Sequence, residues 1–188
     1  MSLRYDSIDH LQRYRDHRAY PAIHDPLFRL IFDTSTSSRY LDLCCGTGLL
    51  GQRLMDQAGS AFVLGVEAST NFQLARSHGV SIAVAQFVVG RETLAVLADV
   101  ISRNEITALI ARRCLPEILG GHPSLDVPLV EVLASSGIIE VFVQGRVVSN
   151  RSTNRLASVD AEIGVLSSRY RVTTKRGPCC RLILKETV

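Results

Sequence analysis

The chain has 188 residues, of which 46% are hydrophobic and 21% are charged, and its net charge at pH 7 is +3. This length and apolar content suit one compact domain with a sizeable core, and they exclude a disordered chain. The sequence contains no apolar run of about eighteen residues that would span a bilayer, and its charged start is unlike a signal peptide. We therefore expect a cytoplasmic protein without a membrane segment.

Two helices are predicted before the first strand, at residues 6–19 and 25–33. In the second helix Asp25 is expected to be the N-cap and Pro26 the first helical residue, because these positions favour those residue types. A polar stretch at 35–38 follows and is expected to act as a hinge.

From residue 39 onward, predicted strands and helices alternate. The predicted strands are residues 40–44, 61–66, 80–89, 106–111, 138–143, 170–174 and 180–184. The predicted helices between them are residues 48–57, 70–78, 92–102, 126–134 and 159–168. Short apolar strands that alternate with helices are typical of an α/β fold with an open, mostly parallel sheet. The two closing strands indicate one antiparallel strand near an edge.

The five cysteines are Cys44, Cys45, Cys114, Cys179 and Cys180. An odd count with two adjacent pairs does not form a disulfide framework. Adjacent cysteines also lack the gap that lets two thiolates grip one zinc ion. We expect buried, reduced thiols and no metal site.

A glycine-rich turn follows the first strand of the alternating region, where residues 46–51 read Gly-Thr-Gly-Leu-Leu-Gly. Such strand-to-helix turns let the backbone approach a nucleotide-like ligand. Asp42 argues against a dinucleotide, because its carboxylate would lie near the pyrophosphate. A ligand with an ammonium or sulfonium group would favour this carboxylate. Glu67, which ends the next strand, has an acidic side chain suited to ribose hydroxyls.

At these residues the sequence resembles the class I methyltransferases that use S-adenosyl-L-methionine (SAM). The resemblance rests on Asp42-Leu43-Cys44-Cys45-Gly46-Thr47-Gly48, on LGVEAS at 64–69, and on the order of elements from residue 39 to the end. It implies a Rossmann-like, doubly wound, seven-stranded sheet, mostly parallel with one antiparallel strand near the edge, plus N-terminal helices. It also implies a single domain over 1–188, with a helical lid at 1–38 and a Rossmann-like core at 39–188.

The resemblance also implies a set of site residues. Gly46 and Gly48 would face the methionyl part of SAM, Asp42 its amino group, and Glu67 its ribose. The full expected cofactor-binding set is Asp42, Cys44, Gly46, Thr47, Gly48, Glu67, Ala68 and, from the lid, Arg18. Cys44 replaces a glycine of the family pattern, which is tolerable if this residue needs no positive φ.

Structural alternatives remain for both acids. In these alternatives, Asp42 caps the following turn and Glu67 belongs to the N-cap region of the next helix. If Glu67 instead holds the ribose at an exposed strand end, its replacement is expected to weaken SAM binding at little cost in stability.

Methyl transfer requires no side-chain nucleophile, so the catalytic predictions depend on position. Arg112, after the fourth strand, is expected to contact the acceptor; the alternative is that it only fastens the sheet to the next helix. His24 in the lid is a candidate general base. The signature of adenine amino-methyltransferases is absent and the basic residues are scattered. We therefore expect a small-molecule acceptor. A nucleic-acid or protein methyltransferase and a non-catalytic SAM-binding module are the alternatives.

Overall fold

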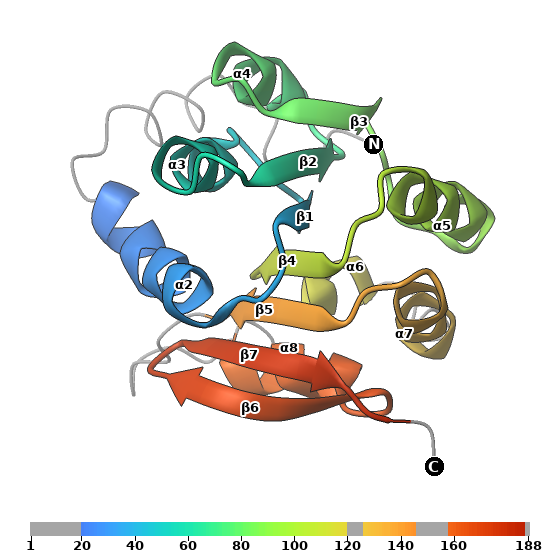
Figure 1. Cartoon of the computed structure of the whole chain (residues 1–188). Coiled ribbons are helices and arrows are strands. Elements are labelled where there is room, and N and C mark those ends of the chain that lie inside the picture. Colours follow the sequence, from blue (N-terminus) through green and yellow to red (C-terminus); the bar gives the residue numbers. More distant parts are fainter. Residues whose placement is uncertain (1–19, 120–125, 146–157, 187–188) are drawn as a thin grey trace.

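The structure is a computed structural model that describes residues 20–119, 126–145 and 158–186 (Figure 1). Its strands are β1 (Arg39–Leu43), β2 (Phe62–Glu67), β3 (Ser81–Ala85), β4 (Ala108–Arg112), β5 (Glu140–Gln144), β6 (Tyr170–Arg176) and β7 (Cys179–Leu184). Its helices are α2 (Tyr20–Thr34), α3 (Leu49–Gln57), α4 (Phe72–Ser77), η1 (Arg91–Thr93), α5 (Leu94–Arg103), α6 (Leu115–Leu119), α7 (Asp126–Ser135) and α8 (Val159–Leu166).

The strands form one mixed sheet in the order β3-β2-β1-β4-β5-β7-β6. The first five strands of this order pair in parallel, whereas β7 is antiparallel to both β5 and β6. The prediction of a mostly parallel, seven-stranded sheet with one antiparallel strand beside an edge is therefore confirmed. From β1 the chain adds β2 and β3 toward one edge of the sheet, and from β4 it adds β5 toward the other edge. The order of the sheet therefore reverses between β1 and β4.

Helices cover both faces of the sheet because the central strands are apolar on both sides. In β4, Ala108 and Ile110 pack with α2 and α3, whereas Leu109 and Ala111 pack with α5, α7 and α8. Figure 1 shows α2 and α3 on one side of the sheet and α5 and α7 on the other. This alternation is the period-two pattern of a strand that is buried on both faces.

The helix predicted at 25–33 differs from α2, which begins at Tyr20. Pro26 lies inside α2, so Asp25 is not the N-cap; it forms an ion pair with Arg53 of α3. The apolar stripe was predicted correctly, because Leu27 and Leu30 are fully buried against the sheet. The helix predicted at 6–19 lies outside the described residues.

The linker at 35–38 is an anchor between α2 and the sheet, in place of the hinge that its polar sequence predicted. The carboxylate of Glu140 on β5 accepts hydrogen bonds from the Ser35 hydroxyl (2.8 Å) and from the Thr36 backbone N–H (3.0 Å). Arg181 of β7 donates to the same carboxylate at 2.8 Å. Glu140 is only 2% exposed, so the carboxylate that accepts these bonds is itself shielded from water.

Helix α6 was not predicted, and its cap explains why. The first N–H of this helix, on Leu115, donates to the Glu162 carboxylate at 3.2 Å. Glu162 belongs to α8 and is fully buried. The group that begins α6 therefore comes from a distant part of the chain, and no local pattern indicates it.

Three general features concern the described ranges alone. Within them, none of the helices has the length and apolar character that crossing a membrane requires. The same ranges contain no group of three or more His, Cys, Asp or Glu residues arranged to hold a metal ion. All five cysteines are free thiols.

Candidate functional site

The glycine turn lies between β1 and α3, at the carboxyl ends of the parallel strands. Gly46 has a φ of 55° and Gly48 a φ of 73°. A Cβ on Gly48 would lie 2.8 Å from the Cβ of Ala75, so this glycine lets α4 pack closely. A Cβ on Gly46 would meet nothing within 4 Å. The backbone at Gly46 therefore borders open space that a ligand can fill.

Cys44 departs from the expectation drawn from the sequence. Its φ is 58°, so the glycine that it replaces would have suited this conformation, and the condition for a tolerable replacement is not met. A non-glycine residue in this region is strained by roughly 1–2 kcal/mol. The Cys44 thiol interacts with Cys114, whose pKa is raised by this hydrogen bond and by burial.

Glu67 at the end of β2 ties the glycine turn to the next loop. One carboxylate oxygen accepts the Gly46 N–H at 2.7 Å, and the other accepts the N–H (2.9 Å) and hydroxyl (2.8 Å) of Ser69. Glu67 is 8% exposed, so the expectation of an exposed strand end is wrong. A carboxylate has about four acceptor positions. Three are occupied here, and one remains on the oxygen beside Gly46.

Asp42 is the other acid of the site. It is 3% exposed, and its carboxylate makes no hydrogen bond to another described residue. Burial raises the pKa of Asp42 to about 7, although the nearby positive charge of Arg112 acts to lower it. A buried carboxylate without a donor is costly in its charged form. A cationic group beside Asp42 would therefore stabilise the ionised form of its carboxylate.

Arg112 is brought to Asp42 by the pairing of β1 with β4. Asp42 is opposite Ile110 in this register, and Arg112 follows Ile110 by two residues on the same face of the sheet. Arg112 as a whole residue is half-buried. It lies near enough to Asp42 to affect the pKa of this acid, but the two side chains do not form a salt bridge within 4.0 Å.

Sequence reasoning missed two residues that hold the site together. Ser69 binds Glu67, and the imidazole Nδ1 of His78 lies 2.7 Å from the Thr47 carbonyl oxygen. Because a carbonyl only accepts, Nδ1 of His78 carries the proton. His78 was predicted only as a helix end, and it does cap α4. The position of Ser69 two residues after Glu67 is the local signal that could have revealed its role.

The structure brings most of the predicted cofactor residues together around the turn. Thr47 and Gly48 are buried in this turn. Ala68, which lies between Glu67 and Ser69 in the sequence, is half-buried. Arg18 lies outside the described residues. His24 lies in α2, but its side chain is not described. The structure therefore does not place the predicted lid residues relative to the site.

No protein-family model matches the chain, and no curated protein matches its sequence. Solved structures do match its fold. The N-methyltransferase NodS from Bradyrhizobium japonicum WM9, in complex with S-adenosyl-L-homocysteine (SAH), has a TM-score of 0.60 at 12% identity, over 93% of this chain and 91% of NodS. Human N-acetylserotonin methyltransferase in complex with SAM has a TM-score of 0.63 at 14% identity, over 98% of this chain and 58% of that chain.

The chain has the fold of the class I SAM-dependent methyltransferases. The bifunctional kinase-methyltransferase WbdD also matches, with a TM-score of 0.57 at 16% identity. That match covers 91% of this chain but only 40% of WbdD. At such low identities the shared feature is the methyltransferase fold, and the activities of these proteins are not transferred by the match.

Proposed function

We propose that the protein is a SAM-dependent methyltransferase that acts on a small-molecule acceptor. The observation that carries this proposal is the open side of Gly46, flanked by Asp42 and Glu67 at the carboxyl ends of β1 and β2. Ligands of open α/β sheets bind at this edge, where the strand order reverses. In this sheet the reversal lies between β1 and β4.

The residues present suit SAM better than a dinucleotide. Asp42 offers a buried negative charge to the ammonium group, and Glu67 keeps one acceptor position for a ribose hydroxyl beside Gly46. When bound, SAM supplies an electrophilic methyl group on its sulfonium. A pyrophosphate in the same place would be repelled by Asp42.

In this proposal the chain's own residues bind and orient rather than form covalent bonds to the substrate. Methyl transfer is a displacement, so holding the acceptor in line supplies much of the acceleration. Arg112 is proposed as the charged group on the acceptor side. Only the part of the predicted lid that precedes the buried stripe of α2, with Arg18 and His24, is proposed to cover the site and exclude water, because α2 packs on a face of the sheet from Leu27 onward.

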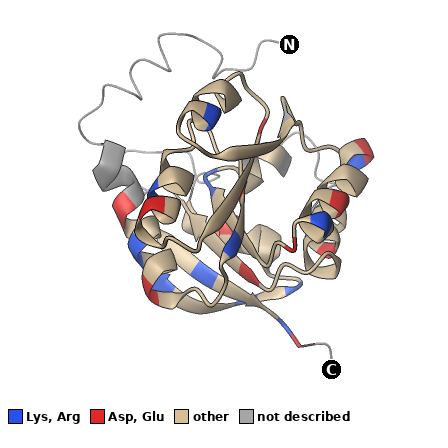
Figure 2. Cartoon of the chain, turned by 45° about the horizontal axis from the view of Figure 1, so that its top comes forward, with Lys and Arg blue, Asp and Glu red and all other residues tan. Residues whose placement is uncertain are grey.

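The arrangement of charges supports a small acceptor over a nucleic acid. Six basic side chains of the described residues form ion pairs with acids, and Figure 2 shows the basic and acidic residues interspersed. A nucleic-acid-binding surface usually presents its basic residues on one face. The described residues show no such concentration.

Calorimetric titration with SAM, SAH and NAD tests the cofactor, and SAH formation in metabolite extracts tests catalysis. We expect SAM and SAH to bind at least tenfold more tightly than NAD, and we expect turnover with at least one small-molecule fraction. Tighter binding of NAD would overturn the proposal. SAM binding without turnover in any metabolite, protein or nucleic-acid extract would favour the non-catalytic binding module.

A further inference from the structure

We propose that Arg112 is a carboxylate-binding subsite at the carboxyl edge of the sheet, where β4 pairs with β1. This inference rests on the proposed function, because it assigns a ligand group to the same site. The carboxylate belongs either to the methionyl part of the cofactor or to the acceptor. Both sources place the same chemistry, a planar anion, on the guanidinium of Arg112.

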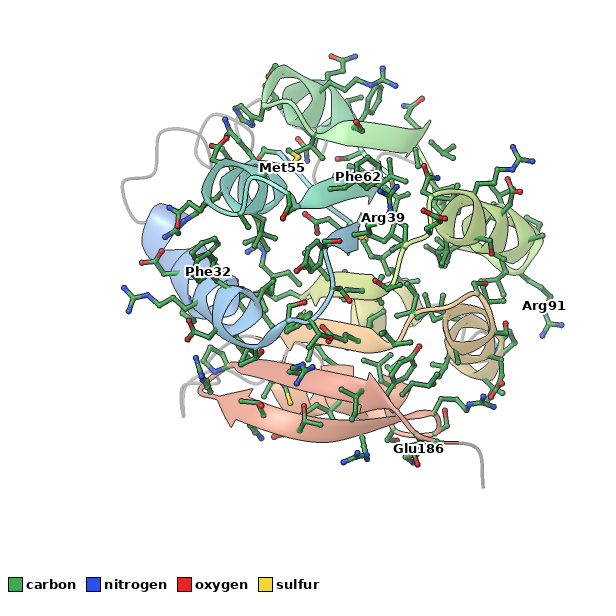
Figure 3. The ribbon with its side chains drawn as sticks, viewed as in Figure 1. Phe32, Arg39, Met55, Phe62, Arg91 and Glu186 are labelled. Carbon is green, nitrogen blue, oxygen red and sulfur yellow. The ribbon has the colours of Figure 1, made fainter. Side chains whose placement is uncertain are left out.

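The first support is the contrast between Arg112 and the other partly buried arginines of the described residues. Arg39 donates to the Asn104 carbonyl at 2.6 Å and stacks over Phe62 at 4.4 Å (Figure 3). Arg181, whose side chain is 18% exposed, is paired with Glu140. Arg112 is half-buried, yet it makes no hydrogen bond or ion pair to another described residue. A partly desolvated guanidinium without an acceptor favours an external anion.

The second support is the position of Arg112 in the fold. It ends β4, beside β1, where the order of the sheet reverses and ligands bind. The residue of β5 that pairs with Arg112 is Gln144, which is polar but carries no charge that would neutralise the arginine. Arg112 therefore lies at the same carboxyl edge of the sheet as Gly46 and Glu67.

The third support is the separation of opposite charges. Asp42 and Arg112 influence each other electrostatically but do not close into a salt bridge within 4.0 Å. Two opposite charges held apart on one face complement a ligand with a cationic and an anionic end. The amino-acid part of SAM carries both an ammonium group and a carboxylate, so the cofactor by itself provides this pair. An acceptor carboxylate beside the cofactor ammonium provides the same pair.

The test compares affinities of four compounds for the wild type and three variants. The compounds are SAM, SAH, decarboxylated SAM and 5′-methylthioadenosine, which lacks the amino-acid part. Arg112→Gln removes the guanidinium charge, Arg112→Lys keeps the charge but loses the planar fork, and Arg103→Gln removes an exposed, distant arginine as a control for net charge. The same proteins are assayed for SAH formation with metabolite extracts that are separated on an anion exchanger.

If the cofactor supplies the carboxylate, the wild type binds SAM about ten- to a hundredfold more tightly than decarboxylated SAM. This preference falls to nearly none in Arg112→Gln and partly returns in Arg112→Lys. If the acceptor supplies the carboxylate, Arg112→Gln leaves the preference for SAM over decarboxylated SAM unchanged. Turnover with the acidic fraction, which the anion exchanger retains, then falls at least tenfold at saturating SAM. Arg103→Gln leaves both quantities unchanged.

The subsite proposal is overturned if Arg112→Gln alters neither the preference for SAM over decarboxylated SAM nor the turnover with the acidic fraction. Turnover only with the unretained, neutral or cationic fraction, together with an unchanged preference, also overturns it. In both results the wild type still binds SAM, so the proposed function stands. A wild type that binds none of the four compounds overturns the proposed function and the subsite together.

Discussion

Asp42 combines almost complete burial with the absence of a hydrogen-bond donor among the described residues. Its pKa is raised to about 7, mainly by burial, so the folded state binds a proton that the unfolded chain releases near pH 4. The associated stability is fully present below the unfolded pKa and is lost as the pH rises through 7. A residue that destabilises the fold at neutral pH is the pattern of a binding site rather than of a core.

We therefore expect Asp42→Asn to stabilise the fold at pH 8 by about 2 to 4 kcal/mol, because it removes a buried charge. At pH 4 the wild type and the variant should be equally stable. SAM affinity should fall at the same time, because the ammonium group loses its partner. Urea unfolding at both pH values and calorimetry measure these effects. A loss of stability at pH 8 would show that Asp42 has a structural role.

Cys44 allows the cost of its positive φ to be isolated. Cys44→Ala removes the thiol contacts but keeps a Cβ, whereas Cys44→Gly removes both the contacts and the strain at φ 58°. We expect the glycine variant to be about 1 kcal/mol more stable than the alanine variant. Thermal unfolding of the two proteins tests this. If the alanine variant is the more stable one, the backbone at residue 44 is not strained.

Glu67 is expected to serve both the fold and the cofactor. Glu67→Ala removes the acceptor of the Gly46 and Ser69 N–H groups, so it should lower stability by about 1–3 kcal/mol and SAM affinity at least tenfold. Ser69→Ala is the matched control, because it removes one donor and leaves the carboxylate. Its SAM affinity should change less than threefold. Equal losses of affinity in both variants would contradict a direct contact of Glu67 with the ribose.

At the scale of elements, Glu140 holds α2 and its linker to the sheet. Burial acts to raise the pKa of this carboxyl, but hydrogen bonds from Thr36, Arg181 and Ser35 outweigh it and lower the pKa below its usual value. The stability that depends on Glu140 is therefore present above the unfolded pKa of 4.5, and it is lost as the pH falls through the folded pKa.

Glu140→Gln should lower stability at pH 7 by about 2–3 kcal/mol, because Arg181 is left without its charged partner. The variant should also lose part of the decrease in stability that the wild type shows on acidification. Glu186→Gln, an exposed acid near the end of the chain, is the control and should have little effect (Figure 3). Urea unfolding from pH 3 to 7 provides the comparison. A stability of Glu140→Gln equal to that of the wild type at pH 7 would show that the network does not anchor α2.

The alternation of strands and helices was predictable because most strands carry a short apolar run and because Gly79 and Gly137 mark the ends of two helices. The bounds of α2 were not predictable. Pro26 is as compatible with a first turn as with the interior of a helix whose buried stripe packs on a sheet. Helix α6 depends on Glu162, and local patterns do not reveal a cap that comes from another helix.

The site was predictable to the extent that local sequence positions it. The spacing of Asp42, Gly46 and Glu67 along consecutive strands places them at one edge of a parallel sheet, as the structure confirms. The proximity of Arg112 to Asp42 depends on β1 pairing with β4, which is a property of the strand order. The positive φ of Cys44 and the burial of Glu67 follow from tertiary packing, so the sequence-based expectations for both were wrong.

At the scale of the whole molecule, two of the buried acids, which lie at opposite edges of the sheet, have opposite electrostatic roles. Glu140, at the start of β5, is satisfied by several donors, whereas Asp42, near the end of β1, is not. Acidification therefore weakens the anchor at one edge while it removes the unfavourable charge at the other. The acid with several donors is therefore at the amino edge, and the acid without one is at the carboxyl edge where ligands bind.

The same distribution of charge leads to a prediction about nucleic acids. The basic residues of β6 and β7 are largely committed to acids: Lys175 pairs with Asp160, and Arg176 pairs with Asp33. A phosphate backbone would have to compete with these acids for the same cations. We therefore expect only weak association with DNA or RNA at roughly 50 mM salt, because few phosphates are neutralised. Such purely electrostatic association should no longer be detectable at about 200 mM salt. Fluorescence anisotropy with labelled single- and double-stranded oligonucleotides of varied sequence measures it. Saturable, sequence-selective binding at physiological salt would reject the small-molecule acceptor in favour of a nucleic-acid substrate.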